Sequence, residues 1–397
     1  MTFLNMLAKY YFGPLHAFLE KNPHLIKTMP GFLVQPEMLI VYVGRTHIAV
    51  EYLGPELVSS VMEDGFALQM KYYDYSKEDC NLFEKIVGLE YDSTLDITLP
   101  LPVFSEDLVM PTNRGLDELT KLGWNFAAQN FIMGINTPAM SVPKGRFCRV
   151  VNGMFFDADE SSGLKSRRIK WLDLFPIRFD GSDSEADSFS FSLEYMQKAV
   201  EDDANYSYPI PTDYKYGKLP LINRFIELWG SKDTTEPMIT AHLGLPENQF
   251  ILTMKFGALR AHAQLNCEWQ SEQKNSIQPD YFVVQPNGYA DIVEFKLPHL
   301  GKNVVVGIEN RETFSAWLQS YISQTRVYQT YFDDPNNRRW FEEKYGFKVH
   351  KPKRWLIVGR RQDFESSVWR DIISDYHDFE IMTFDDLIDG VVVQFYK

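Results

Sequence analysis

The sequence contains 397 residues, 45% of them hydrophobic and 15% aromatic, which predicts a folded globular protein of two or three domains. Its formal net charge of −14 argues against nucleic-acid binding over the whole surface, so the distribution of charge matters. No stretch resembles a signal peptide or a membrane-spanning helix, which predicts a cytoplasmic protein with no membrane partner. The three cysteines, Cys80, Cys148 and Cys267, are isolated from one another and suggest neither a disulfide framework nor a zinc site.

The first half of the chain, residues 1–204, predicts an α+β domain. Apolar residues at loose helical spacing indicate an amphipathic helix over residues 3–21, interrupted near Gly13-Pro14. Another helix is predicted over residues 114–123, where Gly123 ends it. Runs of strand-forming residues predict strands at 32–35, 38–43, 47–53, 66–73, 146–156 and 171–179. No motif in this half points to chemistry, because its histidines are isolated.

Two polar stretches separate the halves of the chain. The acidic, serine-rich residues 180–188 predict an exposed loop, and the proline-containing residues 202–213 predict a linker to a second domain, residues 205–397. Residues 1–204 carry 18 Lys and Arg against 29 Asp and Glu, a net charge of −11, whereas the remainder carries 22 against 25, a net charge of −3. The acidic first domain is therefore expected to regulate the activity of the second domain by covering a basic cleft on it. The alternative is that the first domain mediates oligomerisation or senses DNA without inhibiting the second.

The second half predicts helices and strands in alternation. From Leu219, helical apolar spacing predicts a helix that ends at Gly230, and a second helix begins near Glu236-Pro237 with a preceding threonine as its cap. A long amphipathic helix is predicted over residues 314–328. Residues 258–269 fit either a strand or a helix, and strands are predicted at 250–255, 354–359 and 391–396.

Residues 278–296 are the most informative stretch and predict an antiparallel β-hairpin. Two runs of β-branched and aromatic residues flank Pro286-Asn287-Gly288. These three residues suit a three-residue loop, with the glycine at the left-handed position. Such a loop pairs Gln285 with Tyr289, which fixes the register of the two strands.

Counting back along this register places two carboxylates together. Asp280 lies directly opposite Glu294, whereas a two-residue Asn-Gly loop would place Asp280 opposite Phe295 on the other face. Lys296 shares the face of Glu294, two residues away in the same strand. The two carboxylates and the main-chain carbonyl of Phe295 offer hard oxygen ligands to Mg²⁺, for which Mn²⁺ can substitute. Lys296 can orient or deprotonate an attacking water and neutralise charge on a phosphate.

The spacing of these residues is not specific by itself. Glu272-Gln-Lys274 and Glu342-Glu-Lys344 have the same pattern, yet both are typical of solvated surface charge. Glu294-Phe-Lys296 differs because it ends an apolar strand that pairs with Pro279-Asp280, the only Pro-Asp of the chain. This context predicts a metal-dependent phosphodiesterase.

These motifs and their surroundings resemble the Shedu family of bacterial anti-phage defence nucleases, a branch of the PD-(D/E)XK superfamily. The similarity covers roughly the last 180 residues, about one domain. Leu297 departs from it, because an arginine is expected there. The matching features are Glu236 ahead of His242-Leu243, Pro279-Asp280, Val293-Glu294-Phe295-Lys296 with Pro298, Gln324-x-x-x-Tyr328, residues 355–361 and residues 382–387.

The resemblance implies a fold, an activity and partners. The second domain would be α/β and restriction-endonuclease-like, with a mixed central sheet flanked by helices. It would be an Mg²⁺-dependent endonuclease that hydrolyses double-stranded phage DNA in anti-phage defence, within a homo-oligomer such as a tetramer. A repair or recombination nuclease and a catalytically inactive DNA-binding regulator of the same fold are the alternatives.

The resemblance also assigns roles to residues. Glu236 would be the upstream acid near the metal, although Glu227 and Glu247 are rivals. Gln324 would hydrogen-bond a phosphate or a water, although an ordinary Gln beside a core Tyr328 fits the pattern too. The implied catalytic set is Asp280, Glu294, Lys296, Glu236 and Gln324, and the implied metal ligands are Asp280, Glu294, the Phe295 carbonyl and Glu236.

Basic residues interleaved with aromatic ones cluster late in the chain. They are typical of a channel for a phosphate backbone, although scattered surface cations would give the same pattern. The clusters are Arg338-Arg339-Trp340, Lys351-Pro-Lys353-Arg354-Trp355 and Arg360-Arg361.

Overall fold

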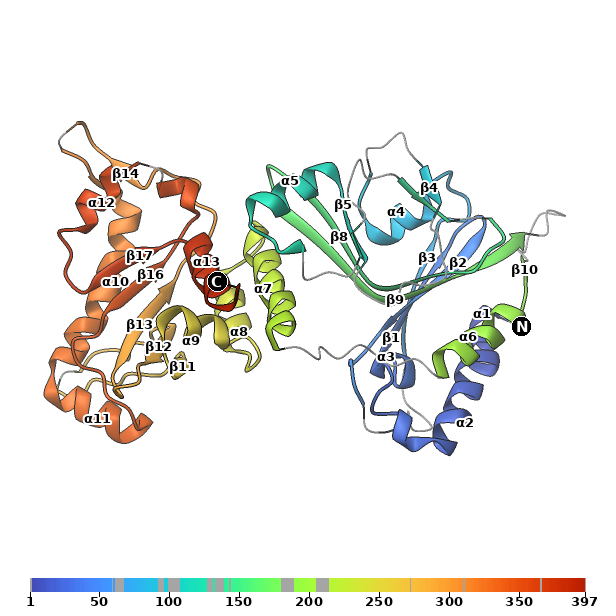
Figure 1. Cartoon of the computed structure of the whole chain (residues 1–397), viewed down its shortest axis with the longest axis horizontal. Helices are drawn as coiled ribbons and strands as arrows, with labels where there is room; N and C mark the ends of the chain where they lie inside the picture. Colours follow the sequence, from blue (N-terminus) through green and yellow to red (C-terminus); the bar gives the residue numbers. More distant parts are fainter. Residues whose placement is uncertain are drawn as a thin grey trace. The chain divides into compact units, whose positions relative to one another are not determined.

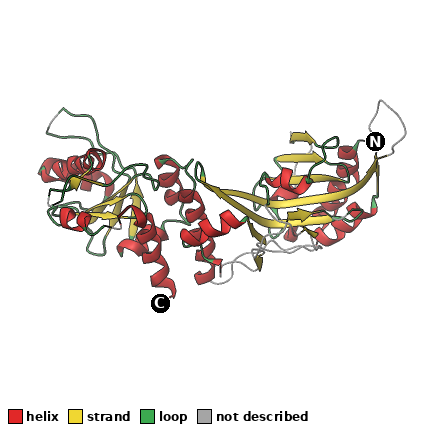
Figure 2. Cartoon of the chain, turned by 90° about the horizontal axis from the view of Figure 1, so that it is seen from above, coloured by secondary structure: helices red, strands yellow, loops and turns green. Residues whose placement is uncertain are grey.

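The computed structural model contains two compact units, and each is described by itself (Figures 1 and 2). The first comprises Met1–Leu119, Phe126–Asp159 and Leu164–Thr212, and the second comprises Thr120–Asn125, Glu160–Gly163 and Asp213–Lys397. Both are mixed α/β, each with a mixed sheet flanked by helices. None of the helices among the described residues is long and apolar enough to cross a membrane. The structure describes residues 2–58, 60, 68–91, 96–98, 108–126, 131–132, 139–142, 144–179, 189–204, 214–271, 273–309, 311–364 and 366–396.

The first unit is built on a sheet with strand order β3-β1-β2-β9-β8-β5-β6, with β10 paired to β9. Its strands are β1 (Met38–Val43), β2 (His47–Leu53), β3 (Gln69–Asp74), β5 (Leu108–Pro111), β6 (Phe131–Ile132), β8 (Cys148–Asp159), β9 (Gly163–Phe179) and β10 (Phe189–Phe191). A separate pair consists of β4 (Asp96–Thr98) and β7 (Ala139–Ser141). Its helices are α1 (Phe3–Leu7), α2 (Gly13–Lys21), α3 (Gly31–Val34), α4 (Leu82–Val87), α5 (Asn113–Lys121) and α6 (Glu194–Ala204), with a short 3₁₀ helix at Pro23–Leu25.

The N-terminal helix follows the predicted stripe of apolar residues. Buried side chains recur every four residues and pack against the sheet and α6; they are Phe3, Leu7, Tyr11, Leu15 and Leu19. The interruption predicted near Gly13-Pro14 is a π-helical turn, Ala8–Phe12, that joins α1 to α2. Pro14 lacks an amide hydrogen and its ring crowds the preceding turn, so the backbone widens before it and Gly13 bonds to the Ala8 carbonyl.

Most predicted elements of the first half are present. The strands at 38–43 and 47–53 match β1 and β2, and the helix at 114–123 matches α5, with Gly123 at φ +73° after it. The strand at 32–35 is wrong, because Gly31–Val34 form the buried helical turn α3. A short apolar run carries no periodicity that separates the two structures. Residues 180–188 and most of the predicted linker lie outside the described residues.

A buried ionic network holds four elements of the first unit together. Arg149 on β8 donates from Nε to Asp173 Oδ1 on β9 at 2.5 Å and from Nη2 to Asp203 Oδ2 on α6 at 2.9 Å. The Tyr11 hydroxyl donates to the same Asp203 oxygen at 2.6 Å. The guanidinium carbon lies 4.5 Å from the centre of the Trp171 ring. Burial raises the pKa of Asp203 to about 6, although the charge of Arg149 opposes this shift.

The second unit has a five-stranded sheet with strand order β11-β12-β13-β16-β17, antiparallel from β11 to β13 and parallel from β13 to β17. Its strands are β11 (Arg260–Ala263), β12 (Tyr281–Val284), β13 (Ala290–Phe295), β16 (Arg354–Ile357) and β17 (Phe379–Met382), with a small pair β14 (Val305–Val306) and β15 (Thr313–Phe314). Its helices are α7 (Tyr214–Gly230), α8 (Glu236–Gly244), α9 (Phe250–Phe256), α10 (Ala316–Asp333), α11 (Pro335–Tyr345), α12 (Val368–Ile373) and α13 (Phe384–Tyr396), with a 3₁₀ helix at Arg361–Phe364.

Helices cover both faces of this sheet (Figure 1). The even-numbered side chains Phe282 and Ile292 pack with residues of α10 and α11. The odd-numbered Tyr281 and Phe295 face the other way, where Phe295 meets Phe384 of α13. Because side chains alternate along a strand, every even-numbered residue of the hairpin points toward α10.

Two predicted strands of the second half are helices. Residues 250–255 belong to α9, which ends where Gly257 adopts φ +61°. Residues 391–396 belong to α13, which starts after Thr383, whose hydroxyl accepts the Asp386 amide at 3.1 Å. The run of valines favours a strand locally, but the first-turn cap and packing against α9 override that preference.

The hairpin register is confirmed. Tyr281 pairs with Val293 and Val284 with Ala290, the register that places Asp280 opposite Glu294. The Gln285 amide donates to the Tyr289 carbonyl at 2.7 Å. Gly288 adopts φ +82°, the left-handed conformation predicted for the loop.

This loop gives a stability prediction. Gly288→Ala should destabilise the protein by about 1–2 kcal/mol, because a side chain at positive φ strains the backbone. Packing should contribute nothing, since no atom lies within 4 Å of the added methyl group. The measurement is the midpoint of urea unfolding. Gly301→Ala is the control, because its methyl group also meets open space but its φ is not positive, and an equal loss in both variants would contradict the argument.

Candidate active site at the end of strand β13

The predicted site residues lie around the end of β13, on the face toward α10. Asp280 directly precedes β12, Glu294 is in β13 and Lys296 directly follows it. The Phe295 amide donates to Asp280 Oδ2 at 2.8 Å, which fixes that carboxylate against the neighbouring strand. The Lys296 amide donates to the Ile357 carbonyl at 2.8 Å and so continues the pairing with β16. Backbone pairing on both sides therefore holds this edge in place.

Lys296 connects two carboxylates. The residue is 6% exposed, and its ammonium group donates to Glu294 Oε1 at 3.0 Å and to Glu236 Oε2 at 3.1 Å. The same nitrogen lies 5.4 Å from the centre of the Tyr321 ring. Burial alone would lower the pKa of Lys296, but the charges of Glu294 and Glu236 outweigh it and the pKa is raised. The lysine is therefore held in its charged form.

Glu294 is held through both of its carboxylate oxygens. Gln324 Nε2 donates to Oε1 at 2.7 Å, and the Tyr328 hydroxyl donates to Oε2 at 3.0 Å. These two residues come from one face of α10, where they also contact each other at 3.2 Å. Burial raises the pKa of Glu294, while the Lys296 ammonium opposes the shift. The glutamate has one fixed orientation.

The two facing carboxylates repel each other. Burial, and then the charge of Glu294, raise the pKa of Asp280 to about 7, although the Phe295 amide opposes the shift. Like charges in a buried place disfavour ionisation unless a cation balances them. Lys296 supplies one positive charge, but this charge is shared between Glu294 and Glu236, because the lysine pairs with both carboxylates.

The structure distinguishes the three candidates for the upstream acid. Glu236, in the first turn of α8, reaches Lys296, whereas Glu227 pairs with Arg224 at 2.9 Å. Glu227 and Glu247 lie instead near His242: burial lowers the pKa of this histidine, and the two carboxylates oppose that shift. Thr235 occupies the cap position as predicted, but its side chain makes no capping hydrogen bond.

The helix that carries Glu236 is anchored to the hairpin. Tyr281 directly follows Asp280 in the chain, and its hydroxyl donates to the Thr240 carbonyl of α8. The sequence gives no signal for this contact, because a strand residue within an apolar run shows no sign of a distant partner. Tyr321 likewise has the pattern of an ordinary apolar residue of the helix, although its spacing with Gln324 and Tyr328 places it on the same face of α10, where it contacts Lys296.

The candidate ligands are oxygen atoms, the type of ligand that a hard divalent ion such as Mg²⁺ prefers. Within the described ranges of the chain, no group of three or more His, Cys, Asp or Glu side chains is arranged to hold a metal. The available oxygens are those of Asp280, Glu294 and the Phe295 carbonyl, while Glu236 is turned toward Lys296. Mg²⁺ in proteins is commonly bound through one or two carboxylates, with waters and phosphate oxygens completing its shell. Two carboxylates that face each other across the hairpin fit that pattern.

The basic clusters serve the fold more than a channel. Arg360 is 8% exposed, pairs with Asp385 at 2.9 Å and lies over the Trp229 ring at 4.6 Å. Arg354 is 6% exposed and contacts Thr325. The prediction of a phosphate channel is wrong for these two cations, because they are buried.

The neighbouring cation is exposed but neutralised. Arg361 pairs with Asp386 at 2.8 Å and with Asp389 at 2.6 Å. A phosphate would have to displace these carboxylates to reach it. Two other members of the predicted clusters, Arg339 and Lys351, are exposed.

Comparison with known proteins identifies the part of the chain that carries the site. Residues 235–388 match a family model described as Shedu protein SduA, C-terminal. The resemblance seen in the motifs is confirmed for this segment, which spans less than half of the chain and includes all five predicted catalytic residues. No curated protein matches the chain.

Proposed function

We propose that the segment matching the C-terminal model of Shedu protein SduA is a divalent-metal-dependent nuclease that hydrolyses phosphodiester bonds of DNA in anti-phage defence. One observation carries this proposal: Asp280 and Glu294 face each other across the hairpin, and Lys296 contacts Glu294. The mixed sheet with antiparallel and parallel neighbours of β13 supports a restriction-endonuclease-like fold for this unit. Within that fold the site lies at the carboxyl end of a parallel strand, a common place for ligands in open sheets.

Asp280, Glu294 and the Phe295 carbonyl would hold Mg²⁺ or Mn²⁺, and Glu236 acts through Lys296. The ion would supply Lewis acidity toward a phosphate. The protein contributes orientation: Gln324 and Tyr328 fix the carboxylate of Glu294, and the Phe295 amide fixes that of Asp280. Groups held by such partners keep their geometry when a ligand arrives, which favours catalysis.

Lys296 supplies the positive charge that a reacting phosphate needs. As negative charge builds on the phosphoryl oxygens, a buried ammonium group stabilises it more strongly than one in water would. Glu236 keeps Lys296 charged and aimed, so it is a positioning residue. The lysine also lies where it can orient the attacking water.

The substrate, the assembly and the role of the first unit are part of the same proposal. The substrate would be double-stranded phage DNA and the assembly a homo-oligomer such as a tetramer, as the resemblance of the motifs to the Shedu family implies. The net charge of −11 over residues 1–204 supports a regulatory or sensing role for the first unit, since an acidic body competes with DNA for the same cations.

The test of this function is cleavage of linear and circular DNA by the full chain in Mg²⁺, Mn²⁺ or EDTA. Asp280→Asn and Glu294→Gln should each lower the cleavage rate by a factor of roughly 10²–10³ and weaken Mn²⁺ binding, because each removes one charged ligand. Mn²⁺ binding is measured by electron paramagnetic resonance. Asp291→Asn is the control. Asp291 lies on β13, as Glu294 does, but its carboxylate accepts the Lys353 amide and does not belong to the site. Cleavage in EDTA, or equal effects in all three variants, would refute the proposal.

A further inference from the structure

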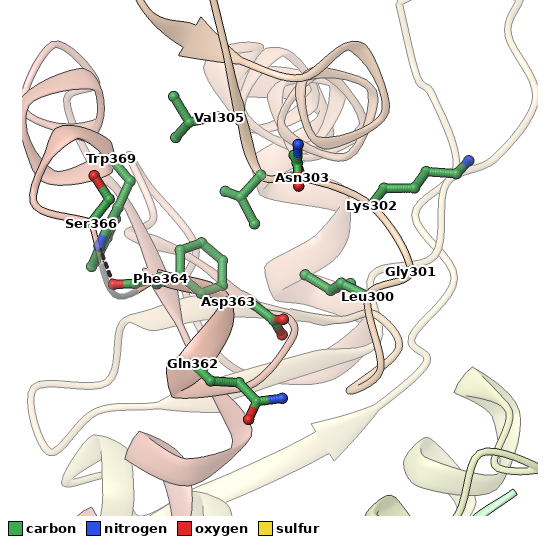
Figure 3. Close-up of a pocket in the computed structure, with 11 residues that line it drawn as sticks. Leu300, Gly301, Lys302, Asn303, Val305, Gln362, Asp363, Phe364, Ser366 and Trp369 are labelled. Carbon is green, nitrogen blue, oxygen red and sulfur yellow. Dashed lines mark hydrogen bonds between the residues drawn. The ribbon is translucent and has the colours of Figure 1, made fainter. Parts of the chain in front are cut away.

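The second unit contains a cavity of about 440 Å³ (Figure 3). It lies between the loop that follows β13, residues 300–305, and residues 362–364, 366 and 369, which follow β16. β13 and β16 are parallel neighbours, so both segments leave the sheet at the edge where Glu294 and Lys296 lie. Crevices outside the carboxyl ends of parallel strands are frequent ligand sites, and this volume is within the usual range of about 300–1,000 Å³.

A row of contacts leads from Lys296 to the rim of this cavity. The Lys296 ammonium group lies 5.4 Å from the centre of the Tyr321 ring. Tyr321 packs edge-on against Trp317, with ring centres 5.7 Å apart. The Trp317 indole in turn donates to the Asn303 carbonyl at 3.2 Å. A strand with its phosphate at Lys296 would therefore bring an adjacent nucleotide near the cavity.

The lining suits a flat, polar-edged group more than a phosphate. Apolar surface comes from Leu300, Val304, Phe364 and Trp369, whereas amides at the rim come from Asn303 and Gln362. Aromatic and apolar surfaces stack on the faces of nucleobases, and side-chain amides pair with their edges. Both amides belong to exposed residues, so they can turn toward a ligand.

Asp363 places a carboxyl group in the lining of the cavity. Figure 3 draws its carboxyl group between Phe364 and Leu300. One oxygen accepts the Arg360 amide at 2.7 Å, and within the described part of the chain the other receives no hydrogen bond. A carboxylate repels phosphate but accepts N–H groups of cytosine, adenine or guanine. Gly359 leaves room for this carboxylate, because a methyl group there would lie 2.6 Å from Leu300 Cδ1 and 3.0 Å from Asp363 Oδ2.

We propose that this cavity accepts one unpaired nucleobase of the strand being cut, stacked on its apolar wall and hydrogen-bonded to Asp363. The inference rests on the proposed function, because it assumes that a DNA phosphate lies at Lys296. It specifies the substrate further: DNA with an unpaired base next to the cleaved bond, as at a frayed end or a mismatch, is preferred over continuous duplex. A paired base cannot enter, because its edge is occupied and its faces are stacked.

The test uses the full chain as Lys296→Met, which should bind DNA without cutting it, and duplexes that carry one 2-aminopurine either unpaired or paired with thymine. The unpaired probe should bind about tenfold more tightly, as expected for one specific base contact, and its fluorescence should fall on stacking. Asp363→Asn and Gln362→Ala should remove most of this preference. Asp375→Asn is the matched control, because that exposed aspartate lies outside the cavity lining.

The outcomes separate the two proposals. Equal binding of both probes, with no change in fluorescence, overturns the cavity inference even if the unmodified protein cleaves DNA. A clear preference that Asp363→Asn abolishes supports the inference even if no cleavage occurs, in which case only the proposed function fails. A free mononucleotide that quenches or competes, while the two duplexes bind equally, overturns the inference and assigns the cavity to a soluble nucleotide.

Discussion

Lys296→Met should reduce the rate of DNA cleavage by a factor of roughly 10²–10⁴, the largest effect of any single substitution in the site. Among the residues that the structure describes, this lysine is the one cation that pairs with Glu294, and it is almost fully buried. Methionine keeps the length and apolar stem of the side chain but supplies no charge to a phosphate and no hydrogen bond to Glu294 or Glu236. The measurement is single-turnover cleavage of a labelled duplex in saturating Mg²⁺.

Lys348→Met is the matched control, because Lys348 is half-exposed and pairs with Glu342 at the surface. Its cleavage rate should stay within about twofold of the unmodified protein, as surface pairs contribute little. Unfolding of both variants must be followed in the same buffer, so that loss of folded protein is separated from loss of chemistry. A folded Lys296→Met protein with an undiminished rate would remove the lysine from the mechanism.

Arg149→Met should destabilise the first unit by about 3–5 kcal/mol, because it leaves two buried carboxylates without their cation. Both Asp173 and Asp203 depend on this guanidinium for hydrogen bonds as well as for charge. The measurement is urea unfolding. Arg114→Met is the control: Arg114 also pairs with a buried aspartate, Asp157, but its own side chain is 67% exposed, and its loss should cost at most about 1 kcal/mol.

The effect of Arg149→Met should depend on pH. The pKa of Asp203 is raised in the folded state, so the folded protein takes up a proton at higher pH than the unfolded chain does. Stability from this group is fully present below pH 3.8, the ordinary pKa of an aspartate, and is lost as the pH rises through about 6. Without Arg149 the penalty for ionisation grows, so the difference between variant and unmodified protein should shrink as the pH is lowered to 5. A difference that is constant between pH 5 and 8 would contradict the buried-charge explanation.

The hairpin could be predicted because local chemistry determines it. Pro286, Asn287 and Gly288 select the loop, the loop selects the register, and the register places Asp280 opposite Glu294. No contact with distant residues enters that argument. Helix α10 was predicted for a similar reason, since its apolar spacing extends over several turns.

The remaining features depend on contacts between distant segments. The strand predicted at 391–396 is helical because the cap at Thr383 and packing on α9 outweigh the valines. The sequence could not show that Arg360 is turned to Asp385 and Trp229, because a pair of arginines has the same local pattern in a channel and in a core. The network around Arg149 has no motif at all, as its members come from four separated elements.

That network also has a consequence for synthesis on the ribosome. The Tyr11 hydroxyl is bonded to a residue 192 positions later, so the network cannot close until the chain has been made through Asp203. At about 5–20 residues per second this interval lasts roughly 10–40 s. Throughout that time the N-terminal helix lacks α6. Arg149 and Asp173 are made late in the interval and still lack their third partner, Asp203, until its end. Nascent chains stalled before residue 203 should therefore be cut by a protease within residues 3–21, whereas chains that have passed α6 should resist.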